Sequence, residues 1–243
     1  MNKCALVLTD GNEAKTLPSR FGAKSESTLL EYVLDSVWTV ADEIFVIFGE
    51  EPSLTTVEKV APFGVKAVID RNGSSAFSMI MAGFRASNSE NCLVVESAAP
   101  FVKPSLLFHL YESVVGFDAA IPRWKDGKTE PLLSAYSRRA FVRAATGLKR
   151  RTLPSLVDSL YDVCYVDIEN LLMPKDPDLH SFFRVRRDSD LRQARVIASS
   201  RVRQFAQRQA QQGWHGNATG QSLSSGHTLE RAAVGGMPWA LSN

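Results

Sequence analysis

The 243-residue sequence is poor in cysteine and histidine and has almost no net charge. Cys4, Cys92 and Cys164 form no CxxC pair and lie in apolar segments, which favours small core side chains in a reducing compartment over a disulfide framework. No apolar run reaches the roughly 20 residues that span a bilayer, and no cleavable signal pattern follows Met1. A formal charge of +2 gives no global reason to expect nucleic-acid binding. We therefore expect a cytoplasmic protein without a membrane or nucleic-acid partner.

Short apolar runs alternate with segments of helical periodicity through most of the chain. The expected strands are 4–9, 44–48, 65–69, 92–95, 119–122, 131–136 and 163–167. The expected helices are 28–38, 53–61, 75–86 and 104–115. Apolar strands separated by helices are typical of a mostly parallel sheet covered on both faces, with the site beyond the carboxyl ends of the strands. The pattern predicts one α/β domain over residues 1–197.

Residues 198–243 have a different composition from the rest of the chain. A helix over 189–211 would run into this extension, and 212–243 is rich in Gly, Ser and Asn with little periodicity. We expect a helical extension followed by a flexible or partner-dependent tail. Trp214 and Trp239 could dock on the body of the protein or on a second subunit.

The loop after the first expected strand combines a turn with a nearby cation. It reads Leu8-Thr9-Asp10-Gly11-Asn12-Glu13-Ala14-Lys15 and lies between a strand and a helix. Backbone N–H groups in such a loop can face phosphates while Lys or Arg neutralises their charge. Asp-Gly is also an ordinary turn signal. The loop predicts nucleotide binding through these candidates: Leu8, Thr9, Asp10, Gly11 and Asn12.

Six segments together resemble the MobA-like nucleotidyltransferases, the molybdopterin guanylyltransferase family, over residues 1–195. The first loop, LTDG-N-E-A-K, is similar to LAGG-x-S-x-R-M-G…K, with Arg20 about where the family has its Lys. The other segments are LLEYV (29–33), DRNGSSAFSMIMAGF (70–84), LVVESAAPF (93–101), EPLLSAY (130–136) and RVRRDSDL (184–191). Their order and approximate spacing match those of the family.

The resemblance implies a three-layer α/β/α Rossmann-like fold and transfer of a nucleoside monophosphate from an NTP to a phosphorylated acceptor. In the guanylyltransferase branch GTP donates GMP to molybdopterin; the cytidylyl and cobinamide-phosphate branches stay open. Lys15 and Arg20 would contact phosphates. Asp70 would lie near the donor base, or would only cap the following loop. Arg123 would face the acceptor, or belong to a solvated hairpin.

The family's metal-binding Asp is replaced by Ala98, which has no oxygen to offer Mg²⁺. Glu96 lies two residues earlier, so on an extended strand it would point to the same face as Ala98. Glu96 could therefore bind the metal in place of the missing Asp and is our tentative metal ligand. Together with Lys15 and Arg20 it is also a candidate catalytic residue. The alternative is a solvated carboxylate at the end of a strand.

Two family Asn positions near the C-terminus of the domain are Arg184 and Arg186 here, with Arg187 beside them. Strand alternation puts Arg184 and Arg186 on one face and Arg187 toward solvent. The two arginines could form an anion site that replaces the metal, because guanidinium pairs well with phosphate. They could instead be surface charges on an edge strand.

Three hypotheses for function follow from these matches and departures. The first is a GTP-dependent guanylyltransferase. The second is a non-catalytic pseudoenzyme that binds a nucleotide or cofactor and serves a protein partner through the tail. The third is a scaffold with a closed pocket, which an open pocket lined by Gly11, Lys15, Arg20 and Asp70 would exclude.

Overall fold

The computed structural model describes residues 2–19, 26–71 and 75–216. Residues 1–203 form one compact unit, and residues 204–243 are a second unit. The predictions for Arg20, for Trp239 and for the tail after residue 216 fall outside the described residues, as does the side chain of Trp214.

A seven-stranded sheet in the order β5-β4-β1-β6-β8-β7-β9 forms the centre of the described fold. Neighbouring strands run parallel from β5 to β6; β8 is antiparallel to both β6 and β7, and β9 is parallel to β7. The strands are β1 (Cys4–Leu8), β4 (Glu43–Phe48), β5 (Lys66–Ile69), β6 (Asn91–Glu96), β7 (Ala119–Arg123), β8 (Leu133–Ser137) and β9 (Val163–Asp167). Each of the seven expected strands is present, and the mostly parallel sheet is confirmed.

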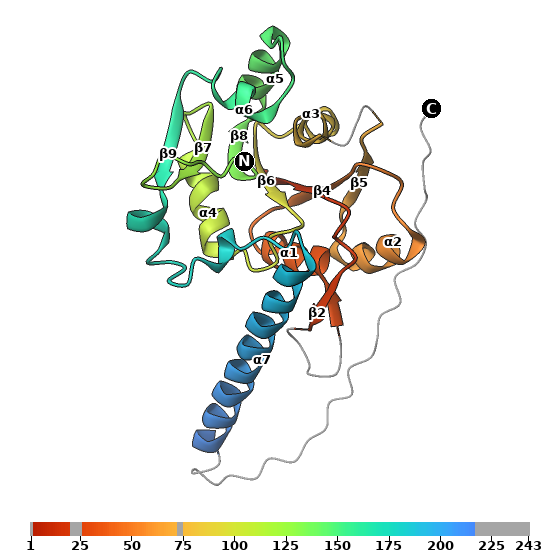
Figure 1. Cartoon of the computed structure of the whole chain (residues 1–243), viewed down its shortest axis with the longest axis vertical. Helices are drawn as coiled ribbons and strands as arrows, with labels where there is room; N and C mark the ends of the chain where they lie inside the picture. The colour runs from red at the N-terminus through yellow and green to blue at the C-terminus, as the bar shows by residue number, and fades with distance from the viewer. Residues whose placement is uncertain (1, 20–25, 72–74, 217–243) are drawn as a thin grey trace. The chain divides into compact units, whose positions relative to one another are not determined.

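Helices cover both faces of this sheet, which confirms the three-layer arrangement (Figure 1). Side chains alternate along β1, so Ala5 and Val7 pack with one set of helices while Leu6 and Leu8 pack with the other. The first set is α1 (Leu29–Trp38), α2 (Leu54–Val60) and α4 (Pro104–Ser113). The second set is α3 (Ala76–Ala86), α5 (Arg138–Gly147) and α6 (Leu153–Val157).

The remaining elements connect these layers or follow them. A two-stranded antiparallel ribbon pairs β2 (Thr16–Pro18) with β3 (Glu26–Thr28). Thr28 is also the N-cap of α1 and forms a capping box with Glu31. The sequence reasoning missed this ribbon, α5 and α6. The other segments are the short 3-10 helices Ala61–Phe63 and His180–Phe182, the π-helical turn Ile168–Leu172, and α7 (Asp188–Gly216). Of the helices in the described ranges, none is long and apolar enough to cross a membrane.

Gly83 of α3 lets this helix pack closely on β1. A Cβ at Gly83 would lie 2.8 Å from Leu6 Cδ1 and 3.2 Å from Ile47 Cδ1, closer than ordinary contacts. Leu6 and Ile47 are fully buried, so neither can move away without disturbing the core. The glycine therefore sets the distance between α3 and the sheet.

We expect Gly83→Ala to lower the free energy of unfolding by about 1–3 kcal/mol, because overpacking outweighs the better helix propensity of alanine. Urea denaturation would measure the change. Gly147→Ala is the matched control, since a Cβ at the end of α5 meets nothing within 4 Å. Equal stability of the two variants would contradict the close packing of α3.

Candidate functional site

The loop after β1 is held in its shape by its own side chains. Gly11 has φ of 81°, which favours glycine, and the Asp10 carboxylate accepts hydrogen bonds from Asn12 N (3.1 Å) and Asn12 Nδ2 (3.2 Å). Ser97 Oγ, in the turn after β6, also donates to Asp10 Oδ1 at 3.2 Å. The negative charge of Asp10 is thus stabilised by Asn12 in the same loop and by Ser97 in the turn after β6.

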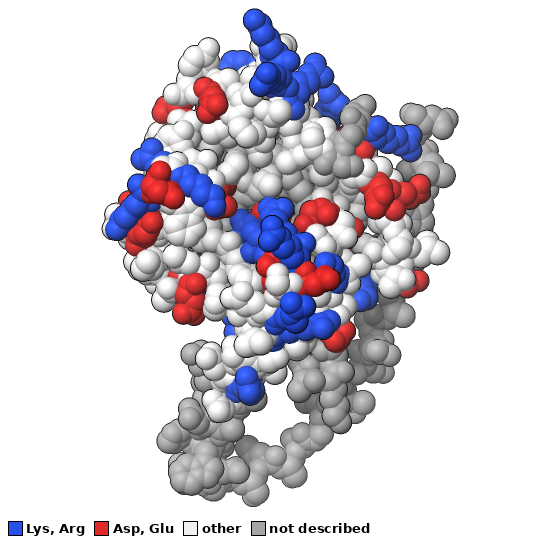
Figure 2. Space-filling view, in the orientation of Figure 1, with Lys and Arg blue, Asp and Glu red and all other residues white. Residues whose placement is uncertain are grey.

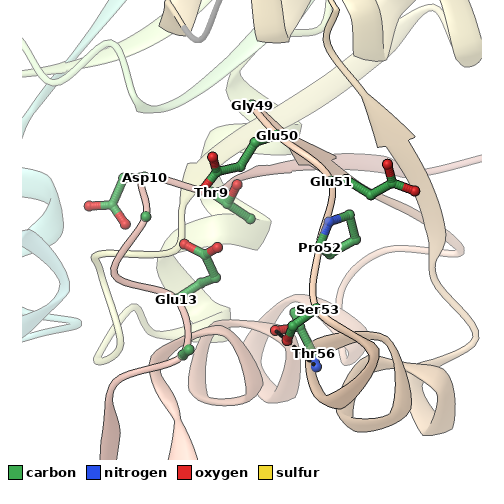
Figure 3. A pocket seen from close by; sticks show the side chains of 11 residues that line it. Thr9, Asp10, Glu13, Gly49, Glu50, Glu51, Pro52, Ser53 and Thr56 are labelled. Atoms are coloured by element: carbon green, nitrogen blue, oxygen red, sulfur yellow. Dashed lines mark hydrogen bonds between the residues drawn. The ribbon is translucent and has the colours of Figure 1, made fainter.

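An open pocket of about 510 Å³ lies between this loop and the segment after β4. Figure 3 shows Thr9, Glu13 and Glu50 around the cavity, with the Glu51 carboxylate turned away. The lining residues are Thr9, Asp10, Gly11, Glu13, Ala14, Gly49, Glu50, Glu51, Pro52, Ser53 and Thr56. This lining contains four carboxylates and no Lys or Arg.

Several predicted nucleotide-binding residues lie at this pocket, and others do not. Thr9, Asp10 and Gly11 line it, while Asn12 turns back to Asp10 and Leu8 is buried in the core. Lys15 and Asp70 are not among its lining residues. The pocket is open, but only Gly11 of the four residues that we expected to line it is found there; Arg20 lies outside the described residues.

Glu13 was missed as a candidate from the sequence. Its Oε2 atom is buried without a hydrogen-bond partner among the described residues, although the side chain lines the open pocket. A buried carboxylate oxygen without a partner costs free energy unless a ligand supplies a donor. The pocket therefore suits a ligand edge that carries N–H groups.

Lys15 points away from the pocket and toward the start of α7. Its Nζ lies 3.2 Å from Asp188 Oδ1, and Arg195 Nε donates to the Thr16 carbonyl at 3.4 Å. The Lys15 side chain is 30 % exposed and that of Asp188 is 82 % exposed, so a ligand can displace this ion pair at little cost.

The carboxylate of Glu96, at the end of β6, is held between two arginines. Arg184 Nε donates to Glu96 Oε1, and Arg186 Nη2 donates to Oε2 at 2.7 Å. The side chains of Glu96 and Arg184 are 5 % and 11 % exposed, whereas that of Arg186 is 55 % exposed. Arg186 thus offers part of its guanidinium to solvent while neutralising a buried carboxylate.

The segment that carries these arginines is held by its backbone. Val185 N donates to the Ala98 carbonyl at 2.9 Å, and the Val185 side chain is fully buried. Arg184 and Arg186 flank Val185 and both reach Glu96, so the expectation that they share a face is confirmed. The edge-strand alternative was wrong, because the segment belongs to no strand.

Ala98 is also placed differently from our expectation. The strand ends at Glu96 and the chain turns at once, with Ala99 N donating to the Glu96 carbonyl at 3.1 Å. The extended geometry that would have put Glu96 and Ala98 on one face is therefore absent here. Ala98 is fully buried.

Glu96, Arg184 and Arg186 form a charge cluster, and Glu130 connects this cluster to the hairpin between β7 and β8. Its Oε1 accepts a hydrogen bond from Trp124 Nε1 at 2.9 Å, and its Oε2 lies 3.7 Å from Arg184 Nη2. The sequence placed Glu130 in a family segment but gave no signal of this pairing. Arg184 is thus set between two carboxylates.

Two acidic residues hold the backbone on either side of the arginines. Asp176 Oδ2 accepts from Ser181 N at 2.7 Å; burial alone would raise the pKa of Asp176, but the bonds from Ser181 and Lys103 lower it overall. Asp190 accepts from the backbone N–H groups of Arg187 and Arg186, which lowers the pKa of Asp190. Both carboxylates therefore stay charged and keep the segment in place.

This donor set does not fit a divalent cation. Ala98 has no oxygen, and both oxygens of Glu96 already accept hydrogen bonds from guanidinium groups. Within the described ranges no group of three or more His, Cys, Asp or Glu side chains is arranged to hold a metal ion. The arrangement instead leaves the half-exposed guanidinium of Arg186 at this edge of the sheet. Figure 2 shows basic side chains with acidic ones next to them in the middle of the molecular face.

The two remaining candidates lie apart from the pocket. Arg123 is exposed, and its guanidinium stacks 4.4 Å from the Tyr165 ring centroid beside a cavity of about 340 Å³, shared with Trp124 and Lys125. Asp70 follows β5, is 3 % exposed, and donates its backbone N–H to the Phe48 carbonyl at 2.8 Å.

We expect Glu96→Gln to lower the free energy of unfolding by about 3 kcal/mol, because it leaves buried Arg184 facing an amide that can donate as well as accept. Urea denaturation would measure this. In the control, Lys66→Gln breaks an exposed ion pair with Glu43 and should cost less than about 1 kcal/mol. A Glu96→Gln variant no less stable than the control would show that the pairing is not structural.

The sequence and fold match known proteins of one family. Residues 19–163 match the family model of the MobA-like NTP transferase domain. A Methanosarcina mazei protein named "Probable molybdenum cofactor guanylyltransferase" is 28% identical over 171 residues, which cover 68% of this chain and 76% of that protein. A Pelotomaculum thermopropionicum protein of the same name is 34% identical over 130 residues, or 53% and 62% of the two chains.

Solved structures agree with these matches. Molybdopterin-guanine dinucleotide biosynthesis protein A from Archaeoglobus fulgidus superposes with a TM-score of 0.60 and 27% identity, over 82% of this chain and 99% of that one. The 2-C-methyl-D-erythritol 4-phosphate cytidylyltransferase of Thermus thermophilus, at 21% identity and a TM-score of 0.57 over 82% and 100% of the chains, shares the fold. The family model spans more than half of the sequence, and the chain belongs to the MobA-like NTP transferase family.

Proposed function

We propose that the protein transfers GMP from GTP to molybdopterin, with the half-exposed Arg186 supplying positive charge that a metal ion would otherwise supply, while the buried Arg184 holds Glu96 in place. The pairing of Glu96 with both arginines beside Ala98 carries this proposal. The names of the curated relatives support the reaction, and the shared fold supports the nucleotidyltransferase class.

The acidic pocket supports guanine as the base. Guanine presents N1–H and N2–H₂ donors on one edge, and a carboxylate can accept from both. Glu13 Oε2 is buried without a partner beside this cavity, and Glu50 lies nearby. Cytosine has a single amino group on the same edge, so the pocket favours the guanylyl branch over the cytidylyl branch.

The phosphates would lie between the β1 loop and Arg186. Arg186 is half exposed, and displacement of the Lys15–Asp188 pair would free a second cation. An oxygen of the acceptor phosphate attacks the α-phosphorus of GTP, the bond to the β-phosphate oxygen breaks, and pyrophosphate leaves. Fixed guanidinium groups can neutralise the charge that builds up on the departing phosphates.

The cavity beside Arg123 is our candidate for the acceptor. Arg123 and Lys125 offer positive charge to a phosphate, and Trp124 offers an aromatic surface to a flat pterin ring. Trp124 is bonded to Glu130, which lies next to Arg184. The acceptor and donor sides are thus joined by direct contacts.

A non-catalytic binding protein that serves a protein partner is the second candidate. The burial of Ala98 and the neutralised Glu96 carboxylate favour it, because neither can ligate a metal. Pyrophosphate release from GTP with molybdopterin decides between the candidates: the enzyme forms one pyrophosphate per dinucleotide formed, and the binding protein forms none.

We expect GTP affinity, measured by isothermal titration, to change less than about twofold when EDTA replaces Mg²⁺, because the positive charge is covalently fixed. Arg186→Gln should weaken binding on the order of tenfold, the value of one charge-assisted hydrogen bond. Arg187→Gln is the matched control, since Arg187 is exposed and its guanidinium makes no hydrogen bond to Glu96, the carboxylate that holds Arg186. Loss of binding in EDTA would contradict the proposal.

We expect Glu13→Gln to remove the preference for GTP over inosine triphosphate, which lacks the N2 amino group. Wild-type protein should bind GTP on the order of tenfold more tightly than inosine triphosphate, the equivalent of one hydrogen bond to a charged acceptor. Glu51→Gln is the control, because the Glu51 carboxylate points away from the cavity (Figure 3). A preference that persists in Glu13→Gln would place the base elsewhere.

A further inference from the structure

A second cavity lies on the face covered by α3 and α5, away from the acidic pocket. Its volume is about 530 Å³, within the range of roughly 300–1,000 Å³ typical of small-molecule sites. The residues that line it are Ser75, Phe77, Ser78, Met81, Arg85, Ala145, Thr146 and Arg151. It shares no residue with the pocket at the β1 loop or with the cavity beside Arg123.

The floor of this cavity is formed by apolar side chains. Phe77 and Ala145 are only 6 % and 7 % exposed, so the half-buried Met81 offers more apolar surface than either. The Phe77 ring stacks on Phe141 of α5, with centroids 6.1 Å apart and planes at 28°. The hydrophobic body of a ligand can contact Met81 and the part of Phe77 that remains exposed.

The rim of the cavity is positively charged. Arg85 lies in the last turn of α3, and Arg151 comes directly before the cap of α6 at Thr152. Both side chains are exposed, and within the described part of the chain neither guanidinium has an ion pair or a hydrogen bond. By contrast, Arg143 of the neighbouring α5 surface pairs with Asp118 at 2.9 Å.

The local hydrogen bonds fix the backbone beside Arg151 and involve neither guanidinium group. The backbone turns before Arg151 and after it, where Thr152 N donates to the Arg150 carbonyl at 3.0 Å and Thr152 Oγ1 accepts from Ser155 N at 3.4 Å. At the opposite end, α3 starts with its N-cap at Ser75 and has no acidic residue in its first turn. Uncompensated positive charge therefore surrounds an apolar floor.

We propose that this cavity binds a small organic anion, whose phosphate, sulfonate or carboxylate pairs with Arg85 and Arg151 while its aromatic or alicyclic body lies on Phe77 and Met81. Guanidinium groups pair with such anions through parallel hydrogen bonds, and the apolar floor adds burial of hydrophobic surface. The site is independent of the nucleotide pocket and does not rest on the proposed guanylyl transfer.

Anilinonaphthalene sulfonate, an aromatic anion that fluoresces on binding, is the probe for the test. We expect wild-type protein to bind it at one saturable site. Arg85→Gln with Arg151→Gln should weaken binding on the order of tenfold or more, because both charge-assisted bonds are lost. The control, Lys149→Gln with Arg150→Gln, removes the same charge from exposed neighbours outside the cavity and should change binding less than about twofold.

Two further experiments distinguish binding in this cavity from unspecific attraction to positive charge and from binding in the nucleotide pocket. Met81→Glu keeps both arginines but puts a carboxylate on the floor, and it should abolish binding; thermal unfolding followed by circular dichroism shows whether each variant is folded. Excess guanosine, which has the guanine base but no anionic group, should not displace the probe. Unchanged affinity in a folded arginine double variant, an equal loss in the lysine–arginine control, or displacement by guanosine would each overturn the proposal.

Discussion

The buried carboxylate of Glu96 organises the carboxyl edge of the sheet, because it can be stable there only with its charge compensated. Arg184 and Arg186 provide that compensation and draw the segment before α7 against the end of β6. Val185, between them in the sequence, buries its side chain in the apolar cluster that contains Leu17 and Phe101, and donates its backbone N–H to the Ala98 carbonyl. The β7–β8 hairpin, through Glu130, and the segment before α7 are therefore joined to the end of β6 by one charge cluster.

This cluster divides the edge into two regions of opposite charge. On the side of β1 and β4, carboxylates such as Glu13 and Glu50 surround an open pocket that contains no cation. On the other side, Arg186 presents part of its guanidinium to solvent. A guanine nucleotide has N–H donors at one end and anionic phosphates at the other, so its polarity matches this division. Under the proposed function, this match lets the protein bind a guanine nucleotide although Ala98 replaces the carboxylate expected to bind a metal.

The sequence predicted the sheet well because buried parallel strands are continuous apolar runs. Arg184 and Arg186 do reach the same carboxylate, but their segment belongs to no strand, so strand alternation is not the reason. It missed the ribbon of β2 and β3, since strands of three residues carry too little periodicity to detect. The pairing of Glu96 with arginines about ninety positions later depends on tertiary contacts that no local pattern encodes. The turn at Ala98 could not be predicted either, because an apolar residue after a strand has the pattern of a longer strand.

An anomalous-scattering map from crystals of the GTP complex grown with Mn²⁺ would show whether an arginine or a metal ion meets the phosphates. Mn²⁺ scatters anomalously and takes the oxygen ligands that Mg²⁺ takes. We expect GTP phosphate oxygens within hydrogen-bond distance of Arg186, with Glu96 still paired to both arginines and no anomalous peak on its carboxylate. An anomalous peak coordinated by Glu96, with Arg184 and Arg186 displaced, would contradict this expectation.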